Sequence, residues 1–420
     1  MSQVNRQAIS KKAIIRRLRD AKLGQINDVR QKRGRRYEFE TLINTLALGT
    51  VAALPSLRKV EALSANLAWS ARRQLKIPRR ISDTKLRDLL LSLTPDDIRE
   101  ALYRQVKAEY RRGALVPDVL PFGVAAIDGK HLAKLDRWDH PGVQKVQPQD
   151  GKPYGLARVH RAFLISSKGV VCIDSRQVCG KSNEVGEAPS FTEEILSAYK
   201  RTNLFEVIMT DAGNASKKHA DKIHDNDKRY IFALKENQGN LYEDACYLLG
   251  NQNAEKAFTE TLRERGAQIT YRLFRAEPSG YHSWTHARQF IRIERTVFYP
   301  GEDPVVGNRY YITDIPQKRL SDTQWLYLIR NYWRIENNGN WTADAIWRED
   351  RRRIQWVKVP EAMYALSVLR MIGQNIIAVL RSMTKREWDR KSQPPWRDMI
   401  FDAYAVLRSY AEGNDQPAFV

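Results

Sequence analysis

The spacing of apolar residues along the chain first predicts a helical region. Before about residue 115, apolar positions recur every three or four residues, as on one face of a helix, for example in residues 38–54 and 86–90. Thr94, Pro95 and the two acids that follow form a strong helix start: a capping hydroxyl, proline at the first helical position and negative charge at the positive end of the helix dipole. Residues 1–118 are therefore predicted to form an all-helical domain.

Beyond residue 122, short apolar runs alternate with helical patterns. Strands are predicted at 124–127, 158–166, 170–177, 205–210 and 230–234, and helices at 190–200 and 216–224. The sequence Ser167-Lys168-Gly169 predicts a hairpin turn between the second and third strands. A strand and a hairpin followed by alternating helices and strands indicate an α/β fold with a mixed sheet and helices on its faces.

A β-rich segment interrupts this alternation between residues 255 and 316. Its predicted strands are 269–276, 289–297 and 309–312, with glycine and proline between them. Helical patterns return with a capping box at 321–324, and a long apolar helix is predicted from Pro360 to about residue 380. We therefore predict a second domain at 119–420, with a core of 119–254 and 317–420 and a β-rich insertion at 255–316.

The charge of the chain indicates a polyanionic partner. It contains 70 Lys and Arg against 49 Asp and Glu, a net charge of +21. Residues 1–36 alone contain twelve basic residues and two acids. A fold does not require such an excess of basic residues. It favours binding to DNA, because basic side chains that neutralise phosphates release the counterions condensed on the backbone. A solvated basic face is the alternative for any single basic run.

The cysteines and the apolar stretches indicate the compartment. Three cysteines, at 172, 179 and 246, have no metal-binding spacing, and their odd number argues against a disulfide framework. The most apolar stretch, residues 42–54, is shorter than the roughly 20 residues that a membrane span needs. We expect a cytoplasmic protein with no membrane partner.

Three acids stand out as candidates for chemistry. Asp128 ends the predicted strand 124–127, and Asp211 ends the predicted strand 205–210. Each has an ordinary alternative, because Asp-Gly is a common turn pair and an acid before a helix is a common N-cap. Two carboxylates at two strand ends of one domain nevertheless favour a shared site.

Glu336 is the third acid. If the helix that starts near residue 321 continues, Glu336 falls within the apolar stripe of Trp325, Ile329 and Tyr332. An ionised glutamate that faces inward is costly unless it is paired or binds metal. The alternative is a salt bridge to Arg330 or Arg334.

Together the three acids predict metal-dependent chemistry on a phosphodiester. Three carboxylates can hold two Mg²⁺ ions about 3.5–4 Å apart, which activate the nucleophile and stabilise the leaving oxygen. Mg²⁺ prefers oxygen ligands and keeps waters, so no His or Cys cluster is needed, and Mn²⁺ can substitute. Two strand-end aspartates and a helical glutamate are compatible with an RNase H-like mixed-sheet catalytic core.

The residues around these acids resemble bacterial insertion-sequence DDE transposases, specifically the ISAs-type or H-repeat-associated group. The similarity covers most of the chain in the right order. The matching motifs are Ala126-Ile127-Asp128-Gly129-Lys130, Lys181-Ser182-Asn183-Glu184, Thr210-Asp211-Ala212, Tyr230-Ile231-Phe232-Ala233-Leu234-Lys235 with Asn237-Gln238, Tyr311-Ile312-Thr313, Trp333-Arg334-Ile335-Glu336-Asn337, Asn340-Trp341 and Arg348-Glu349-Asp350. The N-terminal region around Arg33-Gly34-Arg35-Arg36 is also similar to the helical region of this group.

This resemblance implies an RNase H-like core, interrupted by a β-rich insertion, with Asp128, Asp211 and Glu336 as the catalytic, metal-binding acids. The Arg and Lys that the wider group places around its last acid are replaced here by Tyr332 and Ala343. The candidate DNA contacts are Lys130, Lys235, Asn237, Gln238, Arg330, Arg334, Trp284, Arg33, Arg35 and Arg36.

Two of the neighbouring residues have open alternatives. Trp284 is a candidate for stacking on a flipped base, by position within the insertion, and a buried core position is its alternative. Glu349 and Asp350 form a competing acidic pair, for which salt bridges with Arg351–Arg353 are the alternative.

The function that the resemblance implies is transposition. The chain would bind terminal inverted repeats and target DNA as a homodimer in the bacterial cytoplasm, associated with the nucleoid, and would catalyse Mg²⁺-dependent cleavage and strand transfer. An RNase H-like nuclease without strand transfer and a domesticated, inactive DNA-binding copy are the alternatives.

Overall fold

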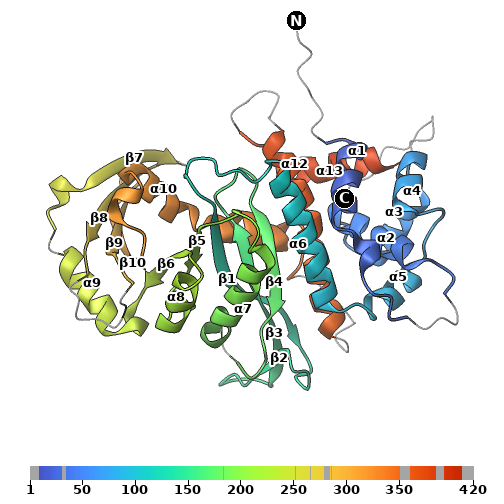
Figure 1. The fold of residues 1–420 in the computed structure, drawn as a ribbon, viewed down its shortest axis with the longest axis horizontal. Helices are drawn as coiled ribbons and strands as arrows, with labels where there is room; N and C mark the ends of the chain where they lie inside the picture. The colour runs from blue at the N-terminus through green and yellow to red at the C-terminus, as the bar shows by residue number, and fades with distance from the viewer. Residues whose placement is uncertain are drawn as a thin grey trace, which may run out of the picture.

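The structure is a computed structural model that describes residues 9–30, 35–182, 184–250, 252–264, 266–278, 284, 286–350, 360–384 and 392–408. It is a mixed α/β fold with thirteen α-helices and one ten-stranded sheet in these residues. Figure 1 shows the sheet running from the middle of the molecule to its left end, with helices α1 to α5 on the right.

Helices alone form the described part of the chain before residue 124, as predicted. They are α1 (Lys11–Asp20), α2 (Phe39–Val51), α3 (Leu57–Ala65), α4 (Trp69–Leu75), α5 (Asp83–Leu90) and α6 (Pro95–Arg111), with a short 3-10 turn η1 (Leu23–Gln25). The predicted start of α6 is confirmed, because the Thr94 side chain accepts a hydrogen bond from the backbone N–H of Asp97 and Pro95 is the first helical residue.

The central strands and their helices also follow the predicted order. They are β1 (Val124–Leu135), β2 (Val143–Val146), β3 (Tyr154–Leu164), β4 (Val171–Gln177), α7 (Glu184–Tyr199), β5 (Val207–Thr210), α8 (Lys217–His224) and β6 (Arg229–Leu234). Strand β1 pairs antiparallel with β3 and parallel with β5, and β5 pairs parallel with β6. The carboxyl end of β5 therefore lies beside Ile127, and β1 continues beyond it to Leu135.

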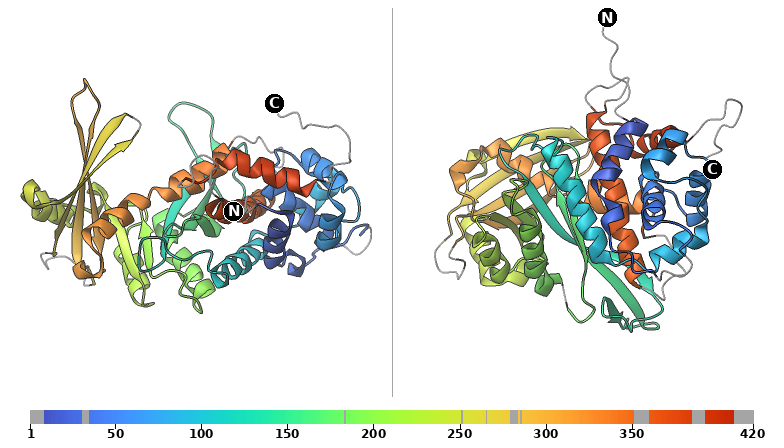
Figure 2. Two further views of the ribbon diagram at one scale, coloured as in Figure 1. Left: turned by 90° about the horizontal axis from the view of Figure 1, so that it is seen from above. Right: turned by 45° about the vertical axis from the view of Figure 1, so that its right-hand side comes forward.

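The strands of the β-rich segment extend this same sheet. They are β7 (Phe258–Glu264), β8 (Ala267–Ala276), β9 (Gln289–Phe298) and β10 (Val305–Thr313), preceded by η2 (Glu236–Gln238), α9 (Asn240–Gly250) and η3 (Ala254–Lys256). Strand β10 pairs antiparallel with β6, so the sheet runs β2-β3-β1-β5-β6-β10-β9-β8-β7, with β4 paired to β3. The far ends of these strands project from the body (Figure 2).

The last part of the chain is helical again. It contains η4 (Gln317–Arg319), α10 (Asp322–Asn331), the π-helical turn η5 (Ile335–Asn340), α11 (Trp341–Ala345), α12 (Pro360–Met383) and α13 (Trp396–Leu407). The capping box predicted at 321–324 is present, since Ser321 accepts from the backbone of Gln324 and Gln324 accepts from the backbone of Ser321.

Helices cover both faces of the sheet. Consecutive residues of β3 point to opposite faces: His160 packs against Phe191 of α7, while Arg161 hydrogen-bonds Ser367 of α12. Figure 2 shows α7 and α8 on one side of the sheet and the C-terminal helices on the other.

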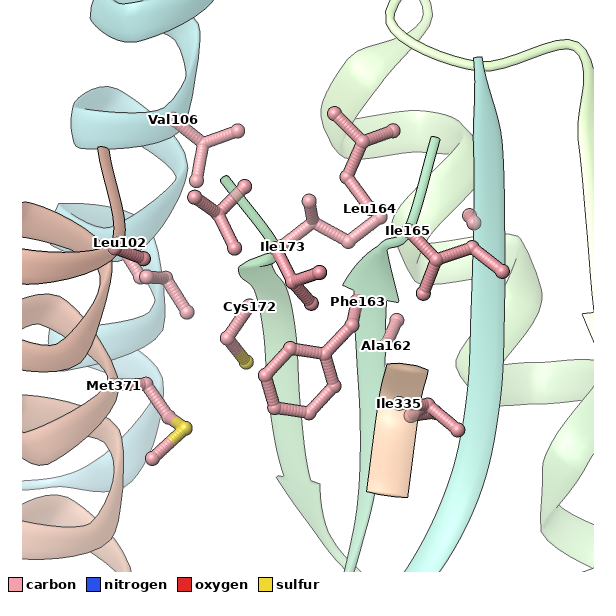
Figure 3. Packing of buried hydrophobic residues seen from close by; sticks show 14 of the residues in the cluster. Leu102, Val106, Ala162, Phe163, Leu164, Ile165, Cys172, Ile173, Ile335 and Met371 are labelled. Carbon is pink, nitrogen blue, oxygen red and sulfur yellow. The ribbon is translucent and has the colours of Figure 1, made fainter. Parts of the chain in front are cut away.

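The N-terminal helices share the hydrophobic core of the sheet. Leu102 and Val106 of α6 and Met371 of α12 pack towards Phe163 and Ile173 of the β3–β4 hairpin (Figure 3). Helix α12 is long and apolar enough to span a membrane, but 89% of its apolar window is buried inside the protein. The composition of α12 is therefore accounted for by its place in this core.

Candidate functional site

The strand register brings two of the predicted acids together. Ile127 of β1 is the parallel partner of Thr210 of β5, and the next residues on the two strands are Asp128 and Asp211. Both aspartates are half-buried. The prediction that the two aspartates lie side by side on neighbouring strands is confirmed, but Asp128 does not end its strand, because β1 continues to Leu135 through its pairing with β3.

The loop after β5 holds Asp211 in a fixed orientation. Its Oδ1 accepts hydrogen bonds from the backbone N–H of Asn214, at 3.1 Å, and from the Asn214 side-chain amide, at 2.8 Å. A Cβ on Gly213 would lie 3.1 Å from Asp211 Oδ2, so this turn fits closely around the carboxylate.

The amides of Asn237 and Gln238 brace the same loop. They donate to the carbonyl oxygen of Ala212 at 3.2 and 2.8 Å, respectively. Gln238 also accepts from the backbone N–H of Lys235 at 2.7 Å. Two predicted DNA contacts thus lie beside Asp211, where their side-chain amides hold the loop. Lys235 is exposed just beyond the carboxyl end of β6.

Asp128 is oriented from the opposite side of the site by Asn340. The Asn340 side-chain amide donates to Asp128 Oδ2 at 3.0 Å. Asn340 is itself fixed, because Lys130 Nζ donates to its carbonyl oxygen at 3.1 Å and Arg161 Nη1 lies 3.4 Å from its Oδ1. These contacts attach the π-helical turn to β1 at Asp128 and Lys130.

Glu336 lies on this π-helical turn and is exposed. The prediction that it faces inward was wrong, because α10 ends at Asn331 and the change to π-helical geometry puts Ile335 in the buried position instead. Tyr332 and Asn340, four residues before and after Glu336, contact β1 at Ile127 and Asp128, respectively.

Tyr332 is a site residue that the sequence analysis did not single out. Its hydroxyl lies 3.5 Å from the carbonyl oxygen of Ile127. Burial raises the pKa of Tyr332 well above its ordinary value, and the charges of Asp128 and Asp211 raise it further. Tyr332 is therefore a neutral phenol directly behind the two aspartates. Its position four residues before Glu336 was the available signal.

A buried ion network adjoins Asp128. Glu349 binds Arg161 at 2.8 Å and Lys130 at 3.5 Å, and Arg370 approaches it to 4.0 Å. Burial raises the pKa of Glu349, but the charges of Arg161 and Lys130 outweigh this and hold it well below its usual range. Glu349 thus pairs with cations far away in the sequence, whereas its predicted partners, Arg351–Arg353, lie outside the described residues.

Three predicted DNA contacts need correction. Lys130 is only 7% exposed and is paired with Asp344 and Glu349, so it does not face solvent. Trp284 is 8% exposed and packs edge-on against Tyr230 and Phe232, which makes it a core residue.

Arg334 is the third correction. Its guanidinium donates to the carbonyl oxygens of Ile165 and Lys168, the latter at 3.1 Å, and burial lowers its pKa. Arg334 anchors the π-helical turn to the β3–β4 hairpin. Its guanidinium nitrogens therefore bind backbone carbonyl oxygens of the protein itself.

Of the other predicted basic contacts, Arg330 is half-buried, while Arg35 and Arg36 lie at the surface. The Arg330 guanidinium pairs with Glu260 at 3.3 Å and Glu264 at 3.7 Å. Arg35 and Arg36 are exposed, and Arg35 lies 3.4 Å from Asp28. Arg33 lies outside the described residues.

An exposed aromatic residue beside Glu336 was missed. Trp333 is 40% exposed, and the Arg309 guanidinium lies 4.2 Å from the centre of its ring. Both residues line a cavity of about 680 Å³ between α10 and strands β7 to β10, and Asn337 lines it as well. Trp333 and Asn337, which precede and follow Glu336 in the sequence, both line this cavity.

The candidate ligand atoms are carboxylate oxygens, which suit a hard cation better than a soft one. Within the described part of the chain, no three His, Cys, Asp or Glu side chains converge closely enough to hold a metal ion. Asp128 and Asp211 are nevertheless adjacent carboxylates held by neutral amides, and oxygen ligands of this kind are those that Mg²⁺ prefers. A third carboxylate would have to come from the exposed Glu336 by a local movement of η5.

Two buried histidines lie on the other face of the sheet. His219 binds the carbonyl oxygen of Asn214 and the hydroxyl of Thr192, and burial lowers its pKa to about 4. Neither ring nitrogen of His160 has a hydrogen-bond partner among the described residues. Burial lowers the pKa of His160 to about 3, and Arg176 adds to this. Both rings are therefore neutral in the folded state at pH 7.

We expect His160→Leu to reduce the acid sensitivity of the fold. Below about pH 6.5 His160 becomes protonated in the unfolded chain but stays neutral in the folded chain. The free energy of unfolding therefore decreases as the pH falls from 6.5 towards 3. Each pH unit costs about 1.4 kcal/mol per histidine. Urea unfolding at pH 7, 5.5 and 4.5 should show a shallower decline for the variant than for the wild type. Parallel declines would contradict this role of His160.

Comparison with known proteins identifies relatives of the chain. No protein-family model matches it. It is 27% identical over 255 residues to "Putative protein YbfL" and to "H repeat-associated putative transposase YhhI", both of Escherichia coli strain K12, and each alignment covers 55% of this chain and 64% of the relative. It is 24% identical over 248 residues to "Putative transposase YncI" of Escherichia coli O157:H7, covering 55% of this chain and 56% of the relative.

These findings confirm the family predicted from the motifs. By sequence, the chain is a homologue of the H-repeat-associated group of transposases. The matched region spans less than two thirds of the length of these relatives.

Proposed function

We propose that this chain is a DDE transposase in which Asp128, Asp211 and Glu336 bind divalent cations and cut and join DNA. One observation carries the proposal. Asp128 and Asp211 directly follow Ile127 and Thr210, which are paired on two neighbouring parallel strands. The names of two relatives support the transposase function.

The topology supports an RNase H-like core around these acids. Strands β4, β3 and β1 form an antiparallel half, and β1, β5 and β6 form a parallel half, with α7 and α8 among the connections. In sheets with parallel strands, sites form beyond the carboxyl ends of the strands. The strands of the predicted insertion follow β6 and precede Glu336, as the resemblance implies.

The residues present fit Mg²⁺, or Mn²⁺ in its place. Asp128 and Asp211 would be its fixed ligands, since Asn340 and Asn214 already orient their carboxylates. Glu336 would complete the set from the π-helical turn. When bound, the cations supply a nucleophile activated at neutral pH and stabilise the charge that develops on the phosphate.

The reaction itself would proceed in two balanced displacements at phosphorus. In the first, water attacks the phosphodiester at the end of the element, and the bond to the 3′-oxygen breaks to leave a 3′-hydroxyl. In the second, that 3′-hydroxyl attacks a phosphodiester of target DNA, and one target 3′-oxygen leaves. The aspartates and Glu336 would hold the cations that keep the attacking and leaving oxygens in line, which is the main requirement of such a transfer.

Surface residues around the acids would hold the DNA. The net charge of +21 favours association with the phosphate backbone. Lys235 is exposed just beyond the end of β6, the strand next to β5. Trp333, three residues before Glu336, forms with Arg309 an exposed platform on which a base can stack. Arg35 and Arg36 would add backbone contacts. We expect a homodimer that pairs two DNA ends at the nucleoid in the cytoplasm.

A strand-transfer assay tests the proposal. The protein is incubated with Mg²⁺, plasmid DNA and a labelled duplex that carries the terminal repeats flanking its reading frame. We expect cleavage at the repeat end and, with a precleaved 3′-hydroxyl end, covalent joining to the plasmid. Robust cutting without joining would indicate a nuclease, and tight binding without either reaction would indicate an inactive DNA-binding copy. Both results would contradict the proposal.

A further inference from the structure

A buried histidine of helix α8 contacts the loop that carries Asp211. His219 lies in the first turn of α8, where its backbone N–H donates to the Ser216 hydroxyl at 3.2 Å. Its side chain turns back towards the loop, and its Nδ1 lies 3.0 Å from the carbonyl oxygen of Asn214. His219 therefore connects the start of α8 with the residue that binds Asp211.

Asn214 holds Asp211 through two donors. Its backbone N–H and its side-chain amide both donate to Asp211 Oδ1, at 3.1 and 2.8 Å. Asn214 is fully buried, and its side-chain oxygen has no hydrogen-bond partner among the described residues. Leaving that oxygen unpaired in the interior costs free energy, so the contact with Asp211 decides the direction of the amide. A shift of Asn214 would move both donors relative to the carboxylate.

The partners of His219 determine which of its ring nitrogens carries the proton. A carbonyl oxygen can only accept, so Nδ1 donates to Asn214. Because burial lowers the pKa of His219 to about 4, the ring is neutral at pH 7 and Nε2 is an acceptor. The Thr192 hydroxyl, 2.7 Å away, then donates to Nε2. One tautomer of the ring thus satisfies both neighbours.

Regular elements of the fold hold the ring of His219 in place. Thr192 belongs to α7, and the ring packs against Phe232 of β6 with 5.0 Å between the ring centres. His219, Thr192 and Phe232 are all fully buried. A side chain that is packed and hydrogen-bonded in this way has little freedom to move, so it can fix the group that it binds. The position of Asn214 is therefore referred to α7, α8 and the sheet.

We propose that His219 is a positioning residue for Asp211: its Nδ1–H group fixes Asn214, and Asn214 in turn orients the Asp211 carboxylate towards a divalent cation. The inference rests on the proposed function, because it assumes that Asp211 is a metal ligand. It gives a buried histidine on the far side of the loop a role in metal binding without direct contact with the metal. The hydrogen bond from Nδ1 is the part of the ring that carries this role.

Two substitutions separate the two ring nitrogens. The amide nitrogen of asparagine can take the place of Nδ1, whereas that of glutamine takes the place of Nε2. Binding of Mn²⁺ to the full-length protein without DNA is measured by electron paramagnetic resonance, which detects the free ion. We expect His219→Gln to lower the affinity by about 10-fold, the lower end of the usual cost of losing an outer partner of a metal ligand. His219→Asn should retain most of the affinity.

This order of affinities distinguishes positioning from a general loss of packing. Asparagine removes more volume from the core than glutamine, so a purely structural role predicts the larger defect for His219→Asn. His160→Leu is the matched control, because His160 is equally buried but neither of its ring nitrogens has a hydrogen-bond partner among the described residues. It should leave the Mn²⁺ affinity unchanged. Circular dichroism and thermal unfolding show whether each variant is folded.

NMR of the wild-type protein labelled with ¹⁵N at histidine tests the inference even if a variant does not fold. We expect one histidine that is neutral at pH 7, carries its proton on Nδ1 and changes its ring signals when Mg²⁺ is added. The absence of any such histidine would overturn the positioning role.

The outcomes separate this inference from the proposed function. If Asp211→Asn weakens Mn²⁺ binding but His219→Gln binds as tightly as the wild type, the positioning role is overturned and the metal site stands. The same conclusion follows if His219→Asn binds as weakly as His219→Gln, or if His160→Leu shows an equal loss. If Mn²⁺ binding does not depend on Asp211, both the inference and the proposed function fail.

Discussion

Asp128→Asn and Asp211→Asn are each expected to reduce Mg²⁺-dependent cleavage of terminal-repeat DNA by at least about 10³-fold. Each change removes one negative charge and one oxygen ligand from the pair that β1 and β5 bring together. The fold should be unaffected, because asparagine has the same shape and can keep the contacts with Asn340 or Asn214. Gel-based cleavage with purified variants gives the rate, and a binding titration in EDTA gives the DNA affinity.

The control for this prediction is Asp225→Asn. Asp225 is an exposed acid at the end of α8, away from the carboxyl edge of the sheet, and its removal changes the net charge in the same way. We expect wild-type cleavage from Asp225→Asn and wild-type DNA binding from all three variants. Retained cleavage in Asp128→Asn or Asp211→Asn would remove that residue from the active site, and lost DNA binding would indicate a structural defect.

Asp174→Asn is expected to lower the free energy of unfolding by about 3–5 kcal/mol, the usual loss when one partner of a buried ion pair is removed. Asp174 is fully buried on β4 and binds Arg99 of α6 through both oxygens, at 2.9 and 2.7 Å. It also accepts from the Tyr103 hydroxyl at 2.8 Å. The variant leaves the Arg99 guanidinium with Glu194 but without its principal buried counter-charge, which weakens the attachment of α6 to the sheet.

Urea unfolding of the wild type and variant measures this loss. Asp96→Asn is the matched control: Asp96 binds the same Arg99 at 3.2 Å, but its side chain is 86% exposed. Exposed ion pairs contribute about 0–1 kcal/mol, so this variant should be nearly as stable as the wild type. Equal losses in the two variants would contradict the assignment of Asp174 as the anchor of α6.

The sequence predicted the parts of the site that depend on local pattern. Asp128 and Asp211 each follow a short apolar run, and the parallel pairing of the two runs places the next residues side by side. That β1 continues past Asp128 to Leu135 depends on its pairing with β3, which the run does not reveal. The predicted inward orientation of Glu336 was wrong because the periodicity argument assumes an unbroken helix. Instead, α10 ends at Asn331 and a π-helical turn follows. The π-helical turn is stabilised by contacts with β1 that are remote in the sequence.

The DNA contacts were predicted less well for the same reason. Lys130 follows Asp128 and Gly129 and looks available in the sequence, yet Asp344 and Glu349, more than two hundred residues later, bury it. Trp284 packs with Tyr230 and Phe232 through the pairing of β6 with β10 that joins the late strands to the sheet. Such long-range partners decide where a side chain points, and spacing does not reveal them.

The central claim is that Asp128, Asp211 and Glu336 together bind the divalent cations that act on DNA. Fe²⁺-directed cleavage of the protein backbone tests it most directly, because Fe²⁺ in place of Mg²⁺ generates hydroxyl radicals that cut the chain next to the metal. With terminal-repeat DNA bound, we predict cuts near residues 128, 211 and 336 that excess Mg²⁺ suppresses. Cuts confined to other segments, or no cuts that Mg²⁺ suppresses, would contradict the account.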